Sequence, residues 1–441
     1  MSLEPPEKVR KLQTALHAKA KGSPGYRFYL LYDKLYREDV LEYAYRCCAA
    51  NGGAAGVDGQ SFSDIESAGR DRWLGELAQE LKERRYQPQA IRRVYIPKPS
   101  GGERPLGIPT VRDRVVQTAA VLVLAPIFEA DLPPEQYGYR PGRSGLDAIR
   151  EVHALINTGH LEVVDADLSG YFDSIPHAEL MQSVARRISD RHVLSLVKQW
   201  LEAPVEEDDR RGGRRRTTHA KDRCRGIPQG APLSPLLSNL YMRRFVLGWK
   251  KLGHARRLKA QIVNYADDLV ICCRGSAQEA MHAMRTMMER LKLTVNETKT
   301  RLCRLPDDTF DFLGYTIGRC WSAQTGRAYL GTRPSRSSVQ RLCRAISERT
   351  QRRFQSVSQE DQVAQLNRML SGWANYFCLG AVSKAYRSVD QHVTSRLRRW
   401  LRCKHKLRST GRTRYPDSYL YEELGLLRLS ERTRSFPWAK A

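Results

Sequence analysis

The hydrophobic positions of the chain follow two different spacings. Apolar residues recur every three or four positions, as on amphipathic helices, and short apolar runs bounded by turn residues indicate strands. The helical spacing predicts helices over 28–50, 71–86, 111–128, 177–201, 232–249 and 281–293. The short runs predict strands over 162–168 and 310–317, and a hairpin over 262–273 whose two apolar runs flank Ala266-Asp267-Asp268.

Two polar stretches interrupt this pattern. Residues 95–109 are rich in Pro and Gly and predict an ordered loop or hairpin, whereas 206–223 are almost wholly polar around Gly212-Gly213 and predict a mobile loop. Strands and helices alternate without the regular rhythm of βαβ units. The pattern therefore favours the α+β class.

Beyond residue 331 the spacing becomes helical and the charge changes. Residues 331–441 hold 23 Lys+Arg against 8 Asp+Glu, so this quarter of the 441 residues carries more than half of the net charge of +26. This step predicts a domain boundary near Gly331. An excess of this size indicates a polyanionic partner, and nucleic acid is the default expectation.

Composition also excludes other classes of protein. The longest apolar stretch, 115–128, is shorter than the roughly 20 residues that a membrane span requires. The ten cysteines form no CxxC pair, which argues against a zinc knuckle or a disulfide framework. We therefore expect a cytoplasmic protein with no membrane association and reduced, inert cysteines.

One predicted helix combines an apolar stripe with a cationic face. Val393, Leu397, Trp400 and Leu401 share helical spacing, and the arginines around them are Arg396, Arg398, Arg399 and Arg402. Such a face suits a phosphate backbone. The alternative is a solvated charged face, although few acidic residues balance it.

Acidic residues at the predicted hairpin indicate a metal site. Adjacent strand residues point to opposite faces, so Asp267 and Asp268 cannot both be buried in one core. Asp165 and Asp167 end the predicted strand before it and could add carboxylates. Carboxylates on neighbouring strands could hold two divalent ions for displacement at phosphorus. The alternative is that Asp-Asp simply suits a turn.

Several motifs resemble those of reverse transcriptases, and most closely those of the group II intron reverse transcriptase/maturase family. The resemblance extends over about residues 25–405 and rests on motifs in the family's order: Gly56-Val57-Asp58-Gly59, Tyr95-Ile96-Pro97-Lys98-Pro99, Gly107-Ile108-Pro109, Tyr137-Gly138-Tyr139-Arg140-Pro141-Gly142, Asp167-Leu168-Ser169-Gly170-Tyr171-Phe172-Asp173, Gly226-Ile227-Pro228-Gln229-Gly230, Tyr265-Ala266-Asp267-Asp268 and Gly372-Trp373-Ala374-Asn375-Tyr376-Phe377.

This resemblance implies a right-hand polymerase with fingers, palm and a helical thumb. It divides the chain into an N-terminal extension (1–65), fingers (66–160), palm (161–330), thumb or maturase domain (331–405) and a basic C-terminal tail (406–441). Asp167, Asp267 and Asp268 match the catalytic ligands of two Mg²⁺ ions, and Asp165 keeps only a supporting role.

The resemblance also implies a nucleotide site. Lys98 and Arg104 match cations that hold the incoming triphosphate, Phe172 matches a steric gate against the ribose 2′-OH, and Gln229 matches a residue beside the nucleotide. From the residues alone, Phe172 would be a core aromatic and the two cations solvated charges. Lys299 matches a lysine that could protonate the leaving group, with a surface salt bridge as the alternative.

We therefore expect an RNA-directed DNA polymerase of a group II intron that also binds intron RNA to assist splicing and mobility. Its partners would be intron RNA, an RNA template/DNA primer duplex, dNTPs and target DNA, with Arg396, Arg399 and Arg402 contacting nucleic acid. The alternatives are a related enzyme of host repair or defence, and a maturase acting mainly as an RNA-binding splicing factor. Nothing after residue 405 resembles the His-Asn-His nuclease of many group II intron proteins.

Overall fold

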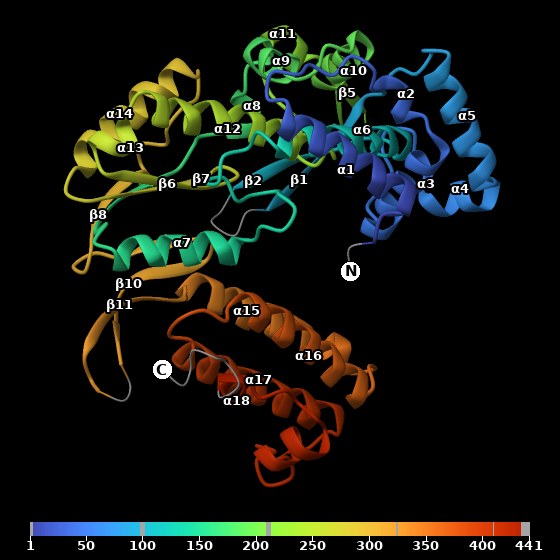
Figure 1. Cartoon of the computed structure of the whole chain (residues 1–441). Coiled ribbons are helices and arrows are strands. Elements are labelled where there is room, and N and C mark those ends of the chain that lie inside the picture. Colours follow the sequence, from blue (N-terminus) through green and yellow to red (C-terminus); the bar gives the residue numbers. More distant parts are fainter. Residues whose placement is uncertain (1–2, 98–101, 209–212, 323–324, 409, 434–441) are drawn as a thin grey trace.

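A mixed helix and sheet body lies above a helical domain (Figure 1). This computed structural model describes residues 3–97, 102–208, 213–322, 325–408 and 410–433. The body contains the predicted fingers and palm, and the lower domain is the predicted thumb. The α+β class and the right-hand polymerase arrangement are confirmed.

The N-terminal helices pack around one buried helix, α6 (Val111–Glu129). Residues over 111–128 were expected to form a largely buried helix, and Val115, Val116 and Val123 are fully buried. Thr110 begins α6, since its hydroxyl accepts a hydrogen bond from the Asp113 N–H. The surrounding helices are α1 (Glu7–Gly22), α2 (Tyr32–Leu35), α3 (Glu38–Asn51), α4 (Phe62–Ala68) and α5 (Arg70–Lys82).

The single helix predicted over 28–50 is wrong in its first half. Phe28 forms a β-bridge with Ile188, and the carboxylate of Asp190 accepts hydrogen bonds from the N–H groups of Leu31 and Tyr32. These contacts with a distant segment hold the backbone extended before α2 and α3. The same Asp190 caps α10 (Arg191–Glu202), so the helix predicted over 177–201 is also divided, into α9 (His177–Ala185) and α10.

A four-stranded sheet in the order β2-β1-β4-β5 joins two strands of the predicted fingers to β4 and β5, which come from the range predicted as palm; we call it the fingers sheet. The Pro- and Gly-rich segment forms the hairpin of β1 (Ile91–Pro97) and β2 (Glu103–Ile108). The mobile loop predicted over 206–223 is wrong for its described residues: β4 (Val205–Asp208) and β5 (Arg214–Thr217) pair with each other, and α11 (His219–Arg223) follows. Backbone pairing of β4 with β1 orders this polar segment, and side-chain hydrophobicity gives no sign of that pairing.

The palm is an antiparallel sheet in the order β6-β7-β3-β8. Its strands are β6 (Ala260–Tyr265), β7 (Asp268–Cys273), β3 (Glu162–Ala166) and β8 (Arg301–Arg304), so the hairpin predicted over 262–273 is confirmed. The helices of the palm are α7 (Gly145–Asn157), α8 (Tyr171–Ser174), α9, α10, α12 (Ser234–Lys251), α13 (His254–Arg257) and α14 (Ala277–Arg290).

Both faces of the palm sheet are covered. Val164 and Ile271 belong to the core shared with α12 and α14, whereas Val163 and Val270 belong to the core shared with α7. The adjacent Cys272 and Cys273 divide between these two cores in the same way, and burial raises the pKa of both thiols. Buried, protonated thiols are unreactive, so these two cysteines fit the expectation of inert cysteines, whereas Cys224 is exposed.

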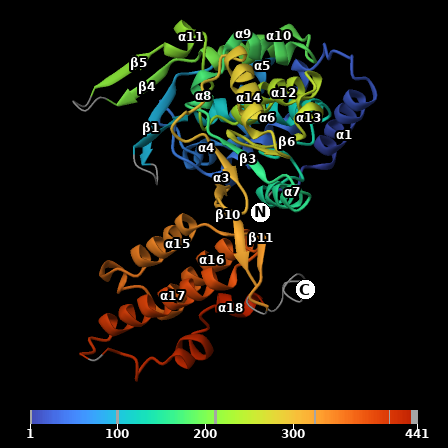
Figure 2. The same cartoon turned by 90° about the vertical axis from the view of Figure 1, so that its left-hand side faces the viewer.

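A small sheet connects the palm to the thumb (Figure 2). It consists of β9 (Phe310–Phe312), β10 (Tyr315–Trp321) and β11 (Ala328–Pro334), and the expected boundary residue Gly331 lies within β11. The thumb contains α15 (Arg336–Arg349), η1 (Arg352–Phe354), α16 (Gln359–Tyr376) and α17 (Ser383–Lys404), and then η2 (Tyr419–Glu423) and α18 (Leu429–Arg432).

The described residues of the C-terminal tail fold back onto the thumb. Tyr415, Leu420, Leu426 and Leu429 are buried in the thumb core, and the Asp390 carboxylate of α17 accepts hydrogen bonds from the N–H groups at the start of α18. None of the helices in the described ranges has the length and apolar content needed to cross a bilayer.

Candidate active site

The palm sheet brings the predicted aspartates to one end of two neighbouring strands. In the ladder between β3 and β7, Ala166 lies opposite Leu269. Asp167 follows Ala166 on one strand, and Asp268 precedes Leu269 on the other, so the two aspartates continue adjacent strands. Asp267 lies in the turn between β6 and β7.

The side chain of Asn264 stabilises the turn that carries Asp267. The Asn264 side-chain amide donates hydrogen bonds to the carbonyl oxygens of Ala266 (2.8 Å) and Asp268 (3.2 Å). Ala266 has a φ of +58°, a left-handed conformation that costs free energy in a residue other than glycine. Asn264 is itself fully buried, so a buried amide stabilises the backbone of the turn.

The electrostatics of Asp268 reflect the other carboxylates. Its pKa is raised to about 7 by desolvation among the surrounding residues and then by the negative charges of Asp267, Asp167 and Asp165, although the residue still reaches solvent. The positive charge of Arg104, on the fingers hairpin, acts in the opposite direction. The fingers cation therefore lies within electrostatic reach of the aspartates.

Asp167 is oriented by residues that follow α14. Its Oδ2 accepts a hydrogen bond from the Asn296 side-chain amide at 2.8 Å and lies 3.5 Å from the Lys299 Nζ. The Asp167 N–H donates to the Thr300 hydroxyl at 3.2 Å. Lys299 thus forms an ion pair with a predicted catalytic aspartate. Asp165 is engaged elsewhere, in an ion pair with Arg301 at 3.2 Å.

The chemistry of these residues fits a divalent cation. Carboxylate oxygens are the ligands that Mg²⁺ prefers, and the mutual repulsion of Asp167, Asp267 and Asp268 is the condition that a bound cation relieves. Within the described residues, no three acidic, His or Cys side chains already stand close enough to form a coordination sphere.

The short helix α8 and the loop of Gln229 carry two of the predicted nucleotide-binding residues to the same place. Phe172 is half-buried, and its carbonyl oxygen accepts a hydrogen bond from the Ile227 N–H at 2.8 Å. The Gln229 side-chain amide donates to the Asp173 carboxylate at 3.4 Å. The short helix α8, which carries Phe172, therefore contacts the loop of Gln229. Lys98 lies outside the described residues.

The fingers hairpin is fixed to the Gln229 loop by backbone contacts. The Gly107 N–H donates to the Gln229 carbonyl oxygen at 2.7 Å. Gly230 has a φ of +107°, and a Cβ there would lie 2.7 Å from the Gly107 carbonyl oxygen. Only glycine permits this approach. Arg104 is exposed on β2, and these backbone contacts hold the strand that carries it beside the site.

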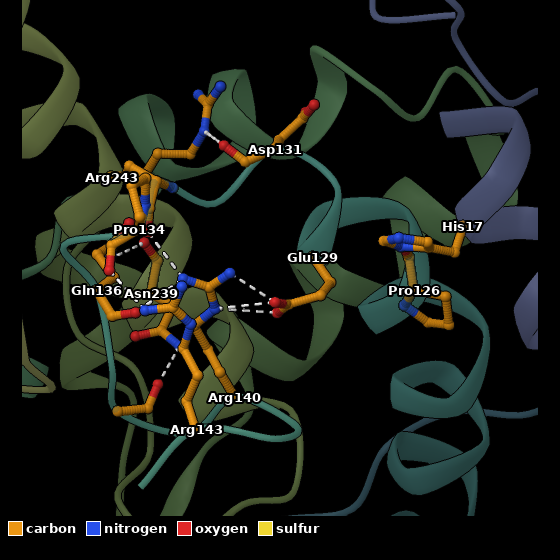
Figure 3. Close-up of polar contacts among 12 residues, drawn as sticks. His17, Pro126, Glu129, Asp131, Pro134, Gln136, Arg140, Arg143, Asn239 and Arg243 are labelled. Carbon is orange, nitrogen blue, oxygen red and sulfur yellow. Dashed lines mark hydrogen bonds and ion pairs between the residues drawn. The ribbon is translucent and has the colours of Figure 1, made fainter. Parts of the chain in front are cut away.

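A polar network supports the aspartate turn from the other side (Figure 3). The buried Arg140 guanidinium binds the Glu129 carboxylate and donates to the carbonyl oxygens of Pro133 and Gln136, both at 2.7 Å. The Gln136 amide donates to the Asn239 carbonyl oxygen, and the Asn239 amide donates to the Gly138 carbonyl oxygen.

This network places the loop of Gly138 directly against the turn. A Cβ at Gly138 would lie 2.6 Å from the Ala266 N, and the Tyr137 N–H donates to the Asn264 carbonyl oxygen at 2.8 Å. The position of Asp267 and Asp268 is thus set by contacts on two sides.

The predicted thumb arginines lie away from the aspartates (Figure 1). Arg396 is used inside the protein: its guanidinium donates to the Thr350 hydroxyl and the Ser347 carbonyl oxygen, at the C-terminal end of α15. Arg399 and Arg402 line a cavity of 760 Å³ between α17 and the tail, together with Arg398 and Arg412. Arg396 also lines a second cavity, of 240 Å³, with Arg352 and Arg399, so all three arginines face a cationic surface and Arg396 in addition binds α15.

Several supporting residues were missed from the sequence: Asn264, Asn296, Glu129, Gln136 and Asn239. Their partners lie at least 100 residues away in most cases, so spacing gives no signal. Arg140 and Asn264 do occur within or beside motifs that the sequence identifies.

Comparisons with known proteins agree with this geometry. Residues 96–317 match the family described as reverse transcriptase (RNA-dependent DNA polymerase), and residues 339–416 match the group II intron, maturase-specific domain. Protein YkfC of Escherichia coli (strain K12) is 32% identical over 348 residues, which cover 70% of this chain and 88% of YkfC.

Two intron-encoded relatives are longer than this chain. Group II intron-encoded protein LtrA of Lactococcus lactis subsp. cremoris is 32% identical over 229 residues, 51% of this chain and 36% of LtrA. The putative COX1/OXI3 intron 1 protein of Saccharomyces cerevisiae is 28% identical over 296 residues, 56% of this chain and 34% of that protein. The matches thus cover only about a third of these relatives.

Proposed function

The chain belongs to the reverse transcriptase family and carries a group II intron maturase-specific domain, so it is an RNA-directed DNA polymerase, and we propose how its residues perform the reaction. Enzymes of this family use divalent metal ions. We assign two Mg²⁺ ions to Asp167, Asp267 and Asp268. The observation that carries this assignment is that Asp167 and Asp268 continue adjacent strands, with Asp267 next to Asp268 in the β6–β7 turn.

When bound, the ions would activate a primer 3′-OH and stabilise the charge of the leaving pyrophosphate. The chain supplies the positions of the carboxylates. Asn296 keeps the Asp167 carboxylate oriented through its 2.8 Å hydrogen bond, and Asn264 keeps the turn of Asp267 in its left-handed conformation.

The incoming dNTP would bind between fingers and palm. Arg104, together with Lys98, would neutralise the triphosphate, because charge-assisted contacts to phosphate are the strongest available to these side chains. Phe172 would lie below the sugar and collide with a 2′-OH. Gln229 would contact the nucleotide from the loop that also holds the fingers hairpin.

The polymer partners follow from the maturase domain. We propose that Arg399 and Arg402 on the thumb contact intron RNA and the primer–template duplex, and that RNA binding also assists splicing and insertion into target DNA. The cationic cavity along α17 supports this role, since its arginines outnumber its single aspartate. Arg396 would contribute by holding α15 against α17.

The decisive experiment is extension of a DNA primer on an RNA template with Mg²⁺ and dNTPs. Asp267→Asn should reduce synthesis by at least about a thousandfold, because it removes a charged ligand without changing volume. Asp307→Asn is the matched control, since Asp307 is exposed on the palm far from the strand ends and pairs only loosely with Arg319.

RNA binding should survive in Asp267→Asn. Synthesis retained at the wild-type rate by Asp267→Asn would refute the metal assignment. Absence of synthesis by the unmodified protein, with RNA binding intact, would instead favour a splicing factor.

A further inference from the structure

A run of exposed cations follows β5 and α11 at the outer edge of the fingers sheet (Figure 2). Residues 213–225 contain six Lys or Arg and one Asp, and no Phe, Trp or Tyr. The cations are exposed, and we call them the basic strip: Arg214, Arg215, Arg216, Lys221, Arg223 and Arg225.

The protein neutralises this strip only in part, because the three arginines of β5 lie opposite the three acidic residues of β4, 206–208. Arg214 reaches Asp208 at 4.0 Å and the Val57 carbonyl oxygen at 3.4 Å. In the part of the chain that the structure describes, the other five cations form no ion pair. The acidic strand β4 is engaged on its other side, where Glu207 lies 3.9 Å from Arg93 and accepts a hydrogen bond from the Tyr95 hydroxyl.

The strip leads directly to the nucleotide site. Arg225 forms a β-bridge with Pro176, and the next residue, Gly226, donates its N–H to the Ile175 carbonyl oxygen at 2.8 Å. The chain then enters the loop that contains Gln229 and contacts Phe172. At its other end, the strip belongs to the sheet that carries Arg104.

We propose that the basic strip binds the backbone of the single-stranded RNA template before it is copied; this assignment rests on the proposed function. β5 and α11 lie at the top of the molecule and the thumb helices at the bottom, with the palm strands β3 and β6 between them in height (Figure 2). Since the copied duplex leaves along the cationic thumb, the strand approaching from the fingers side is the uncopied template.

The composition of the strip also determines the mode of binding. Because 213–225 contain no Phe, Trp or Tyr, they offer no platform for stacking bases. Successive arginines along an edge strand are spaced by roughly 3.3 Å, and their side chains point alternately to the two faces of the sheet. This arrangement of charges suits contacts to phosphates rather than to base edges. Binding should therefore be independent of sequence and sensitive to salt.

The test compares the full chain with Arg215→Gln/Arg216→Gln on two primer–templates. They share one duplex and differ in the template overhang, about two against about fifteen nucleotides, so that only the longer overhang spans a single-strand binding site. On the long overhang, affinity should fall roughly threefold to tenfold, and the slope of log K against log salt should decrease by about 1.4.

The short overhang should bind the variant and the unmodified protein equally. Arg256→Gln/Arg290→Gln is the matched control, because these exposed arginines lie on α13 and α14 and form no ion pair among the described residues. Thermal melting of each variant separates loss of contact from loss of folding.

Equal losses on both overhangs, or no loss on either, would overturn the proposal, and so would a defect confined to duplex DNA. These results differ from a failure of the proposed function. In that case the unmodified protein would make no cDNA on either template.

Discussion

At the scale of single residues, the site consists of common side chains, and their function depends on where the fold places them. Desolvation, and then the negative charges of the neighbouring Asp267 and Asp167, raise the pKa of Asp268 to about 7. Phe172 is a comparable case. The residue lies in α8, is half-buried and packs against the core, and its carbonyl oxygen binds the Gln229 loop, so its position suits a core aromatic as well as a steric gate.

This placement makes sugar selectivity a property that can be tested at Phe172. Phe172→Ala should raise the incorporation of rNTPs relative to dNTPs by roughly tenfold or more, because the space that excluded a 2′-OH is opened. Single-nucleotide incorporation measures the ratio, and Phe172→Tyr, which keeps the ring, is the control. A ratio unchanged in Phe172→Ala would leave Phe172 a core residue.

At the scale of elements, the aspartate turn is held between two supports. Asn264 binds the turn from within the β6–β7 hairpin, and the loop of Gly138 packs against it from outside, anchored by Arg140 and Glu129. A strained turn at Ala266 persists because contacts on both sides determine its conformation.

Gly138→Ala should therefore impair catalysis rather than folding alone. The new Cβ would lie 2.6 Å from the Ala266 N, so the turn must move, and a displacement near 1 Å should lower kcat by roughly a hundredfold. Gly372→Ala is the control, because Gly372 lies within α16 with open space around its Cα.

The two variants are compared by primer extension and by RNA affinity. Gly138→Ala should keep its affinity for RNA, since the thumb is untouched. Wild-type kcat in Gly138→Ala would mean that the loop yields to the turn and does not position it.

At the scale of the whole molecule, cationic surfaces lie both on the fingers sheet and on the thumb. The thumb presents Arg399 and Arg402 beside the folded tail, whereas the fingers present the basic strip. A polyanion that crosses the site can contact both. Of the net charge of +26, residues 331–441 contribute +15 and residues 213–225 contribute +5.

The thumb arginines should differ in what they contribute. Arg399→Gln/Arg402→Gln should lower RNA affinity and reduce the salt slope by roughly 1.5, because two phosphate contacts are removed. Arg396→Gln should instead lower the melting temperature, since it removes hydrogen bonds to Ser347 and Thr350. Salt titrations and thermal melts measure the two effects; an unchanged slope would mean that Arg399 and Arg402 are only solvated.

The sequence by itself determined the family, the class of fold and the reaction. It could do so because the motifs are local: Tyr265-Ala266-Asp267-Asp268 and Gly226-Ile227-Pro228-Gln229-Gly230 have their meaning within a few residues. The hairpin over 262–273 and the buried helix over 111–128 were also predictable, since apolar spacing reports which positions face a core.

Only the tertiary structure decided what depends on contacts between distant residues. The Asp190 carboxylate divides two predicted helices, in one case by accepting hydrogen bonds from the N–H groups of Leu31 and Tyr32. Backbone pairing of β4 with β1 orders a polar segment as the strands β4 and β5. Arg396 and Arg399 lie on one predicted cationic face and line a common cavity, yet only Arg396 also binds the end of α15. Backbone hydrogen bonds and the partner of a charge are not encoded in hydrophobic spacing, because they form between segments that only folding brings together.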